Sequence, residues 1–208
     1  MVNARASAVV FRPAADVWDF MTAVENIPVW TPSAQECESL TDGPLDFGTQ
    51  FMGHSRFLGR RIDWVCEFVV VDRPHRLVLH SVKAPIDFEA VVDFVNVGAH
   101  TRITMSMEFG LGYGRFFGLA DAVVARAHSR RLWSSLRGVS DMLGRDGASG
   151  LTKRQMEVLD LLEDGLSDAE IAAKLSISRK TASNHVAAIL SALGVPTRHY
   201  LFRPLAPD

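Results

Sequence analysis

The sequence predicts an α+β domain, with a curved antiparallel sheet around one long C-terminal helix, followed by a small all-α domain. Three observations predict this order. Segments that alternate apolar and charged residues follow one another before residue 110, a long amphipathic segment spans residues 115–143, and every later segment has helical periodicity. "GRDGASG", residues 144–150, has the composition of a flexible coil. We therefore expect one domain at residues 1–145, a linker at 146–150 and a second domain at 151–208.

Composition places the chain among ordinary globular proteins, since 48% of its 208 residues are hydrophobic and 22% are charged. With a formal net charge of -2, a nucleic-acid contact must be a local patch. Arg12 and Pro13 interrupt the first apolar stretch too early for a signal peptide, and no run is long enough to span a membrane. Cys37 and Cys66 lack metal-ligand spacing and are too few for a disulfide framework. We expect a cytoplasmic protein without membrane contact, metal or cofactor.

The strand segments share one pattern. "ARASAVVF" opens the chain, and Pro13 then begins a helix in "RPAADVWDFMTAVENIPVW". In "RIDWVCEFVVVD" the positions Ile62, Trp64, Cys66, Phe68 and Val70 alternate with charged ones, and "PIDFEAVVDFV" and "TRITMSMEF" repeat this alternation. Successive strands that are apolar on one face and charged on the other form an antiparallel sheet with one solvated face.

The segment at residues 115–143 is the candidate to cover the apolar face, because its apolar side chains recur at helical spacing. A curved sheet around such a helix leaves a cavity between the two, although a solid core is the alternative. The methionines of the last strand suit a pliable lining. We predict a ligand pocket lined by Trp64, Phe68, Phe88, Val92, Phe94, Met105, Met107, Phe117 and Val124.

This order of elements, together with "VWDFMTAVENIPVWTP", resembles the START/polyketide-cyclase superfamily, also called helix-grip or SRPBCC, over residues 4–145. The resemblance implies a helix-grip fold with a pocket for an apolar small molecule that is polyketide-like or lipid-like.

The predicted lining contains no group that transfers protons or stabilises charge, so we predict no catalytic residue in it. Glu67, Glu89 and Glu108 fall on the solvated face of the sheet. His54 and His80 lie in strands with weaker alternation, and either a surface position or the pocket is open to them. A polyketide cyclase or dehydratase-like enzyme, with the C-terminal helices as an appended module, would need such a pair. A lipid carrier is a further alternative.

The second domain has three helices with local start signals. Thr152 with Gln155 has capping-box spacing and begins a helix that runs to Asp164. Ser167 with Glu170 repeats this spacing before a helix that ends at Leu175, and Ser178 caps a third helix that runs to Leu193. The turn between the last two helices is four residues or fewer, as in a helix-turn-helix.

The third helix has two unlike faces. Ala182, Val186, Ile189 and Leu193 form its buried stripe, whereas Lys180, Asn184, Ala187 and Ser191 lie on the opposite side. That outer side is short-chained and uncharged after its first turn. A helix that enters the major groove of DNA needs small side chains for close approach and a few polar groups for base edges.

The stretch "LTKRQMEVLDLLEDGLSDAEIAAKLSISRKTASNHVAAILSALGV", followed by Thr197 and Arg198, resembles the LuxR-type helix-turn-helix of bacterial transcription regulators over residues 151–203. The resemblance implies a module that binds double-stranded DNA, usually as a dimer, with the helix from Ser178 to Leu193 in the major groove.

Roles can be assigned by residue type and place. We predict phosphate contacts from Lys153, Arg154, Arg179, Lys180, Thr181 and Arg198, and base-edge contacts from Ser183, Asn184 and Ala187. The leading interpretation is a ligand-responsive transcription regulator that acts as a homodimer and is not an enzyme. Whether the linker couples the two domains or uncouples them is left open.

Overall fold

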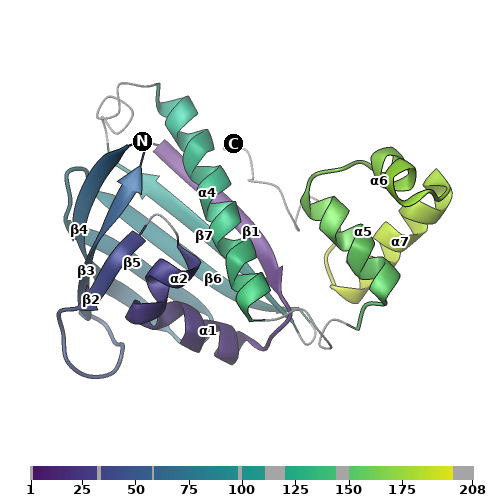
Figure 1. Ribbon diagram of the computed structural model, residues 1–208. Helices are drawn as coiled ribbons and strands as arrows, with labels where there is room; N and C mark the ends of the chain where they lie inside the picture. The colour runs from purple at the N-terminus through teal and green to yellow at the C-terminus, as the bar shows by residue number, and fades with distance from the viewer. Residues whose placement is uncertain are drawn as a thin grey trace.

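The computed structural model describes residues 2–31, 34–57, 59–97, 100–110, 120–143 and 150–198. Figure 1 shows a curved sheet with one long helix across its concave face and a separate group of three short helices. The elements are β1 (Val2–Val10), α1 (Ala14–Thr22), η1 (Val24–Asn26), α2 (Ile27–Trp30), β2 (Ala34–Ser39), β3 (Gln50–Phe57), β4 (Arg60–Asp72), β5 (Arg76–Lys83), β6 (Phe88–Val97), β7 (His100–Phe109), α4 (Asp121–Met142), α5 (Lys153–Glu163), α6 (Asp168–Leu175) and α7 (Arg179–Ala192). The predicted fold class, a helix-grip domain followed by a small helical domain, is confirmed.

The sheet has seven strands in the order β1-β7-β6-β5-β4-β3-β2, and each neighbouring pair is antiparallel. The first strand therefore pairs with the last, while β2 to β7 form a meander. Buried residues alternate along β6 and β7 as predicted, with Ala90, Val92 and Phe94 on the inner face opposite Met107, Met105 and Ile103. This face, α1, α2 and α4 enclose the core of the larger domain.

The inner face of β4 differs from the predicted alternation at its end. Trp64, Cys66 and Phe68 are buried, but Val70 is 40% exposed. The register with β5 shifts between Phe68 and Val70, and a β-bulge exchanges the faces of the residues that follow it. Val71 therefore packs against the core in place of Val70.

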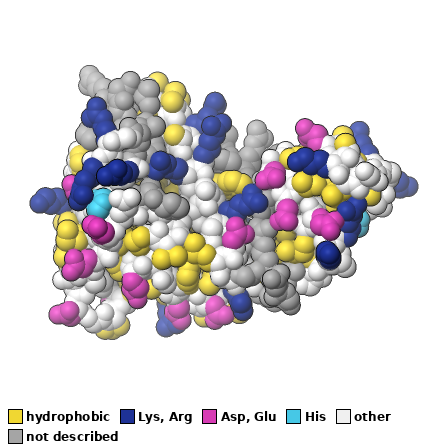
Figure 2. Space-filling view, in the orientation of Figure 1, with side chains coloured by type: hydrophobic (Ala, Val, Ile, Leu, Met, Phe, Trp, Pro, Cys, Tyr) yellow, Lys and Arg dark blue, Asp and Glu magenta, His cyan; other side chains and the backbone are white. Residues whose placement is uncertain are grey.

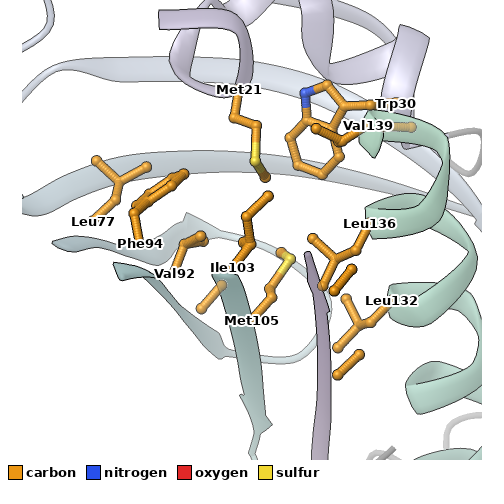
Figure 3. Packing of buried hydrophobic residues seen from close by; sticks show 14 of the residues in the cluster. Met21, Trp30, Leu77, Val92, Phe94, Ile103, Met105, Leu132, Leu136 and Val139 are labelled. Atoms are coloured by element: carbon orange, nitrogen blue, oxygen red, sulfur yellow. The ribbon is translucent and has the colours of Figure 1, made fainter. Parts of the chain in front are cut away.

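Helix α4 begins at Asp121, later than the predicted start at residue 115, and residues 111–119 lie outside the described part of the chain. Its Val124, Leu136 and Val139 are fully buried. Figure 3 shows Leu132, Leu136 and Val139 facing Met105 and Ile103 of the sheet, with Met21 and Trp30 entering from α1 and α2. Among the described residues, no helix has both the length and the apolar character that a membrane span requires.

The caps predicted for the small domain are confirmed. The Thr152 N–H donates to Gln155 Oε1 at 2.7 Å, and the Thr152 hydroxyl accepts from the Gln155 N–H. Ser167 and Glu170 form the second capping box, and the Ser178 hydroxyl accepts from the Thr181 N–H at 3.0 Å to start α7. The three helices pack around a second apolar cluster that includes Ile171 and Ile189.

Candidate functional site

The larger domain contains a cavity of about 190 Å³ between the concave face of the sheet, α2 and α4. Of the side chains predicted to line a pocket, the structure places seven on the cavity wall, namely Trp64, Phe68, Phe88, Val92, Phe94, Met105 and Met107. Val124 is fully buried in the core but is not part of the wall. Phe117 lies outside the described residues. The described side chains thus leave a cavity rather than the solid core that was the alternative.

Several polar side chains that the sequence reasoning missed also line the cavity. They are Thr31, Ser55, His128, Arg131 and Ser135. Burial, assisted by the positive charge of Arg131, lowers the pKa of His128 to about 3, so this imidazole is neutral at physiological pH. The helical spacing of Val124, His128 and Leu132 is the signal that could have found it, because residues four apart share a face.

His54 and His80 do not line the cavity. His54 is buried on the other side of β3, where its Nε2 lies 3.0 Å from Gln35 Oε1 of β2. His80 is paired with Glu67 of β4 and Glu89 of β6 in register and shares their face of the sheet. The position away from the pocket, which the sequence left open for both histidines, is the one they occupy.

The two cysteines are free thiols in β2 and β4. Burial raises the pKa of Cys37 to about 11. Burial, together with the charge of Cys37, raises the pKa of Cys66 to about 12. Both thiols are therefore protonated at physiological pH, and neither is activated as a nucleophile.

The outer side of α7 is uncovered. Lys180, Asn184, Ala187 and Ser191 are exposed, whereas Ala182, Val186 and Ile189 on the opposite side are buried. Arg179 and Lys153, at the first turns of α7 and α5, are also exposed. In Figure 2, Lys and Arg side chains stand out at the end of the small domain farthest from the sheet. The described residues of the larger domain therefore leave this side of α7 exposed.

Other predicted contact residues are held by partners within the protein. Asp168, at the start of α6, accepts hydrogen bonds from the Ser183 hydroxyl and from the Arg198 guanidinium. Arg154 donates to Glu157 Oε2 at 2.6 Å and to the Leu175 carbonyl at 2.9 Å, which ties α5 to the end of α6. The hydroxyl of Thr181 lies 2.8 Å from that of Ser178. Ser183, Arg198 and Arg154 thus brace the helices against one another, whereas Thr181 bonds to the N-cap of its own helix.

The carboxyl of Asp168 is tuned by these contacts. Partial burial raises its pKa, but the hydrogen bonds from Ser183 and Arg198 and the positive charges of Arg198 and Arg179 lower it more. The pKa of Asp168 therefore lies below its ordinary value. The Asp168 carboxylate links α6, α7 and the segment after α7 into one unit.

The two domains contact each other beside β1. Val9 alternates with Ala8 and Val10 of the first core, and Val9 and Phe11 are buried in the cluster of the small domain with Leu159 and Ile189. Gly194, just after α7, approaches the end of β6 so closely that a Cβ would lie 2.8 Å from Val97 Cγ1. Its φ of +62° also favours glycine.

Helix α4 takes part in this contact as well as in the cavity. Arg137 Nη1 lies 3.2 Å from Asp164 Oδ1 at the end of α5, and the Ser140 hydroxyl donates to the Val9 carbonyl at 3.2 Å. His128 and Arg131, two to three turns earlier on the same helix, line the cavity. Figure 1 shows the C-terminal ends of α4 and β1 on the side nearest the small domain.

The family model for "Polyketide cyclase / dehydrase and lipid transport" matches residues 1–141. The chain belongs to this family. The model for "Bacterial regulatory proteins, luxR family" matches residues 149–203, so α5, α6 and α7 form a LuxR-type helix-turn-helix. Both resemblances seen in the sequence are confirmed.

The curated relatives include several bacterial transcription regulators. The DNA-binding transcriptional activator DevR/DosR of Mycobacterium tuberculosis is 28% identical over 113 residues, which cover 53% of this chain and 51% of that protein. The transcriptional regulatory protein LnrK of Bacillus subtilis is 41% identical over 63 residues, covering 30% of this chain and 29% of LnrK. The spore germination protein GerE of the same organism is 46% identical over 48 residues, covering 23% and 65%. The matched region thus spans about half or less of the first two regulators.

Solved structures match the larger domain. A protein from Thermus thermophilus has a TM-score of 0.59 at 18% identity, covering 68% of this chain and 96% of that one. The Zhui aromatase/cyclase from a Streptomyces species has a TM-score of 0.57 at 16% identity, covering 72% and 98%. At these identities the likeness shows the helix-grip fold and nothing about chemistry.

Substitution of Asp168 by Asn tests its bracing role. At pH 7 we expect a loss of about 1–2 kcal/mol in the free energy of unfolding of the small domain, because Ser183 and Arg198 lose a charged partner. The folded-state pKa is lowered, so this stabilisation is complete above the ordinary pKa of about 3.9 and disappears as the pH falls through the lowered value. Urea unfolding of Asp168→Asn and of the control Asp42→Asn, an exposed loop residue, at pH 7 and pH 3 measures it. An Asp168→Asn deficit that is equal at both pH values would contradict the role.

Proposed function

We propose that this protein is a ligand-responsive transcription regulator, in which α7 binds the major groove of double-stranded DNA and the cavity binds an apolar small molecule that changes DNA affinity. The observation that carries the DNA half is the exposed flank of α7, which is short-chained and uncharged after Lys180 in its first turn. The names of the relatives, among them a DNA-binding transcriptional activator, support it.

We divide the predicted DNA contacts into two sets by their exposure and their partners. Arg179 and Lys180 lie in the first turn of α7, where the helix dipole favours a phosphate, and Lys153 is exposed at the first turn of α5. Asn184, one turn after Lys180, suits an adenine edge, and Ala187 permits close approach. Ser183 and Arg198 are bonded to Asp168, so we assign them to orienting α7. A symmetric operator would take two such modules, as in a homodimer.

The apolar character of the cavity supports the ligand half. Its wall is built largely from aromatic, methionine and branched aliphatic side chains. Such a wall binds apolar molecules through the hydrophobic effect. An enzyme would also need a base inside, and His128, with its pKa of about 3, is a weak base. The wall therefore favours binding over turnover.

The response itself requires that the ligand distinguish two arrangements of the domains. Helix α4 is the element that can carry the difference, because it lines the cavity with His128 and Arg131 and contacts α5 through Arg137. Val9 and Phe11 add a buried apolar contact between the domains. The two sites therefore share a continuous packed connection.

Two substitutions on α7 test DNA recognition. Asn184→Ala should lower the preference for the operator over other sequences by about 1–3 kcal/mol, because one base contact is lost. Lys180→Ala should weaken binding to all DNA sequences about equally, because one phosphate contact is lost. It should also reduce the slope of log binding constant against log salt concentration by about 0.9. Gel shifts on an operator, selected from genomic fragments with the full chain, measure both effects. Lys83→Ala, on an exposed strand position, is the control. Wild-type affinity in both α7 variants would contradict the proposal.

Substitutions of two adjacent valines of β6 test whether the cavity binds an apolar molecule. Val92 lines it, whereas Val91 lies on the other face of the strand. N-phenyl-1-naphthylamine, an uncharged fluorescent probe, should bind the wild-type chain, and Val92→Phe should weaken that binding about tenfold by filling the space. Val91→Phe should leave it unchanged. Fluorescence titration gives the dissociation constants, and far-UV circular dichroism checks folding. Equal effects of the two substitutions would place the probe elsewhere.

Reciprocity tests the coupling. Saturating operator should change the affinity for the probe by the same factor, about fivefold or more, by which the probe changes the affinity for the operator. Phe11→Ala should bring both factors toward one while each separate affinity persists, because it removes the buried contact between the domains. The control is Phe47→Ala, since Phe47 is 71% exposed. A saturating operator that leaves the affinity of the wild type for the probe unchanged would refute coupling.

A further inference from the structure

One end of the cavity holds the positive charge of an arginine. Arg131 of α4 lines the cavity, and its Nη1 donates to the Arg56 carbonyl of β3 at 3.0 Å. Arg56 is paired with Arg61 in the β3–β4 register, on the face of the sheet away from the cavity. Figure 2 shows Lys and Arg side chains gathered over this end of the sheet and on the nearby part of α4.

This concentration of positive charge has an electrostatic cost. Like charges that face each other on paired strands are destabilising. Asp63 accepts a hydrogen bond from Arg61 Nε at 2.7 Å, and Glu36 lies 3.9 Å from His54 on the neighbouring strand pair. His128, beside Arg131 on α4, is neutral. An anion bound at this end of the cavity would therefore be favoured by the Arg131 charge.

A hydrogen-bond donor lies at the same end. The Ser55 hydroxyl lines the cavity and accepts from Trp64 Nε1 at 2.9 Å. Because a hydroxyl both accepts and donates hydrogen bonds, the Ser55 O–H can donate a hydrogen bond to an anionic ligand oxygen. The wall beyond Ser55 and Arg131 is mostly apolar, with Phe68, Phe88 and other core side chains, and its other polar members are Thr31, His128 and Ser135.

We propose that the cavity binds an amphipathic organic acid, with its carboxylate between the Arg131 guanidinium and the Ser55 hydroxyl and its apolar body along the inner face of the sheet. This rests on the proposed function, in which the cavity is a ligand site. The volume of about 190 Å³ slightly exceeds that of an engineered cavity of about 150 Å³ that holds benzene. The cavity reaches the surface at the exposed Arg131, so a medium-length alkyl chain or a ring system can enter it from solvent.

A comparison of an acid with the alcohol of the same chain length tests whether the cavity prefers the acid. A carboxylate loses far more than a hydroxyl on leaving water, so a cavity without a cation prefers the alcohol. Octanoate and 1-octanol, which share a chain length, are titrated at pH 7.5 against the full-length protein loaded with N-phenyl-1-naphthylamine. Octanoate should displace the probe at about fivefold lower concentration, because the carboxylate gains a charged hydrogen bond.

Arg131→Gln should abolish or reverse this preference, whereas Arg130→Gln, at the neighbouring exposed position outside the cavity wall, should preserve it. If octanol displaces the probe from the wild type at the same concentration as octanoate or a lower one, the proposal of an acidic ligand is wrong. A preference that survives Arg131→Gln, or that Arg130→Gln reduces equally, would overturn the role of Arg131. If the wild type binds no probe, the ligand half of the proposed function fails, and the acid fails with it.

Discussion

The packing of α4 against the concave face of the sheet is the constraint on which the rest of the larger domain depends. Val124, Leu136 and Val139 are completely buried there, and such burial contributes about 1.5–3 kcal/mol for each side chain. A straight helix cannot follow a curved sheet along its whole width, so a space remains where the two diverge. The cavity is thus a consequence of the fold, and its chemistry is set by the side chains that α4 and the strands direct into it.

The same helix contributes His128, Arg131 and Ser135 to a largely apolar wall. His128 and Arg131 lie one turn apart on α4, and burial next to a positive charge keeps the imidazole neutral. A neutral histidine beside an arginine is suited to hydrogen bonding an oxygen of a ligand, and it is poorly suited to removing a proton. Helix α4 then continues to the small domain, where Arg137 reaches Asp164. Such a half-exposed ion pair contributes at most about 1 kcal/mol, so the buried Val9 and Phe11 provide the firmer part of the contact.

In the small domain, the exposed side of α7 does not pack against the other two helices. Asp168 binds Ser183 and Arg198, and Arg154 binds the end of α6, so polar side chains that could compete for DNA hold the helices together. What remains exposed on α7 is a flank with Lys180, Asn184 and Ala187. Because the contact with the larger domain involves the end of α7, this flank stays open to a partner.

The sequence by itself determined the fold class, the alternation of the strands and the starts of the three C-terminal helices. These features depend on residues within three or four positions of one another, as with Thr152 and Gln155 or Ser167 and Glu170. Only the tertiary structure decided the bulge that places Val71 inside, the positions of His54 and His80 away from the cavity, the bonds of Ser183 and Arg198 to Asp168, and the contact of Phe11 with the small domain. Each of these depends on strand register or on partners distant in the chain, and local periodicity carries no information about either.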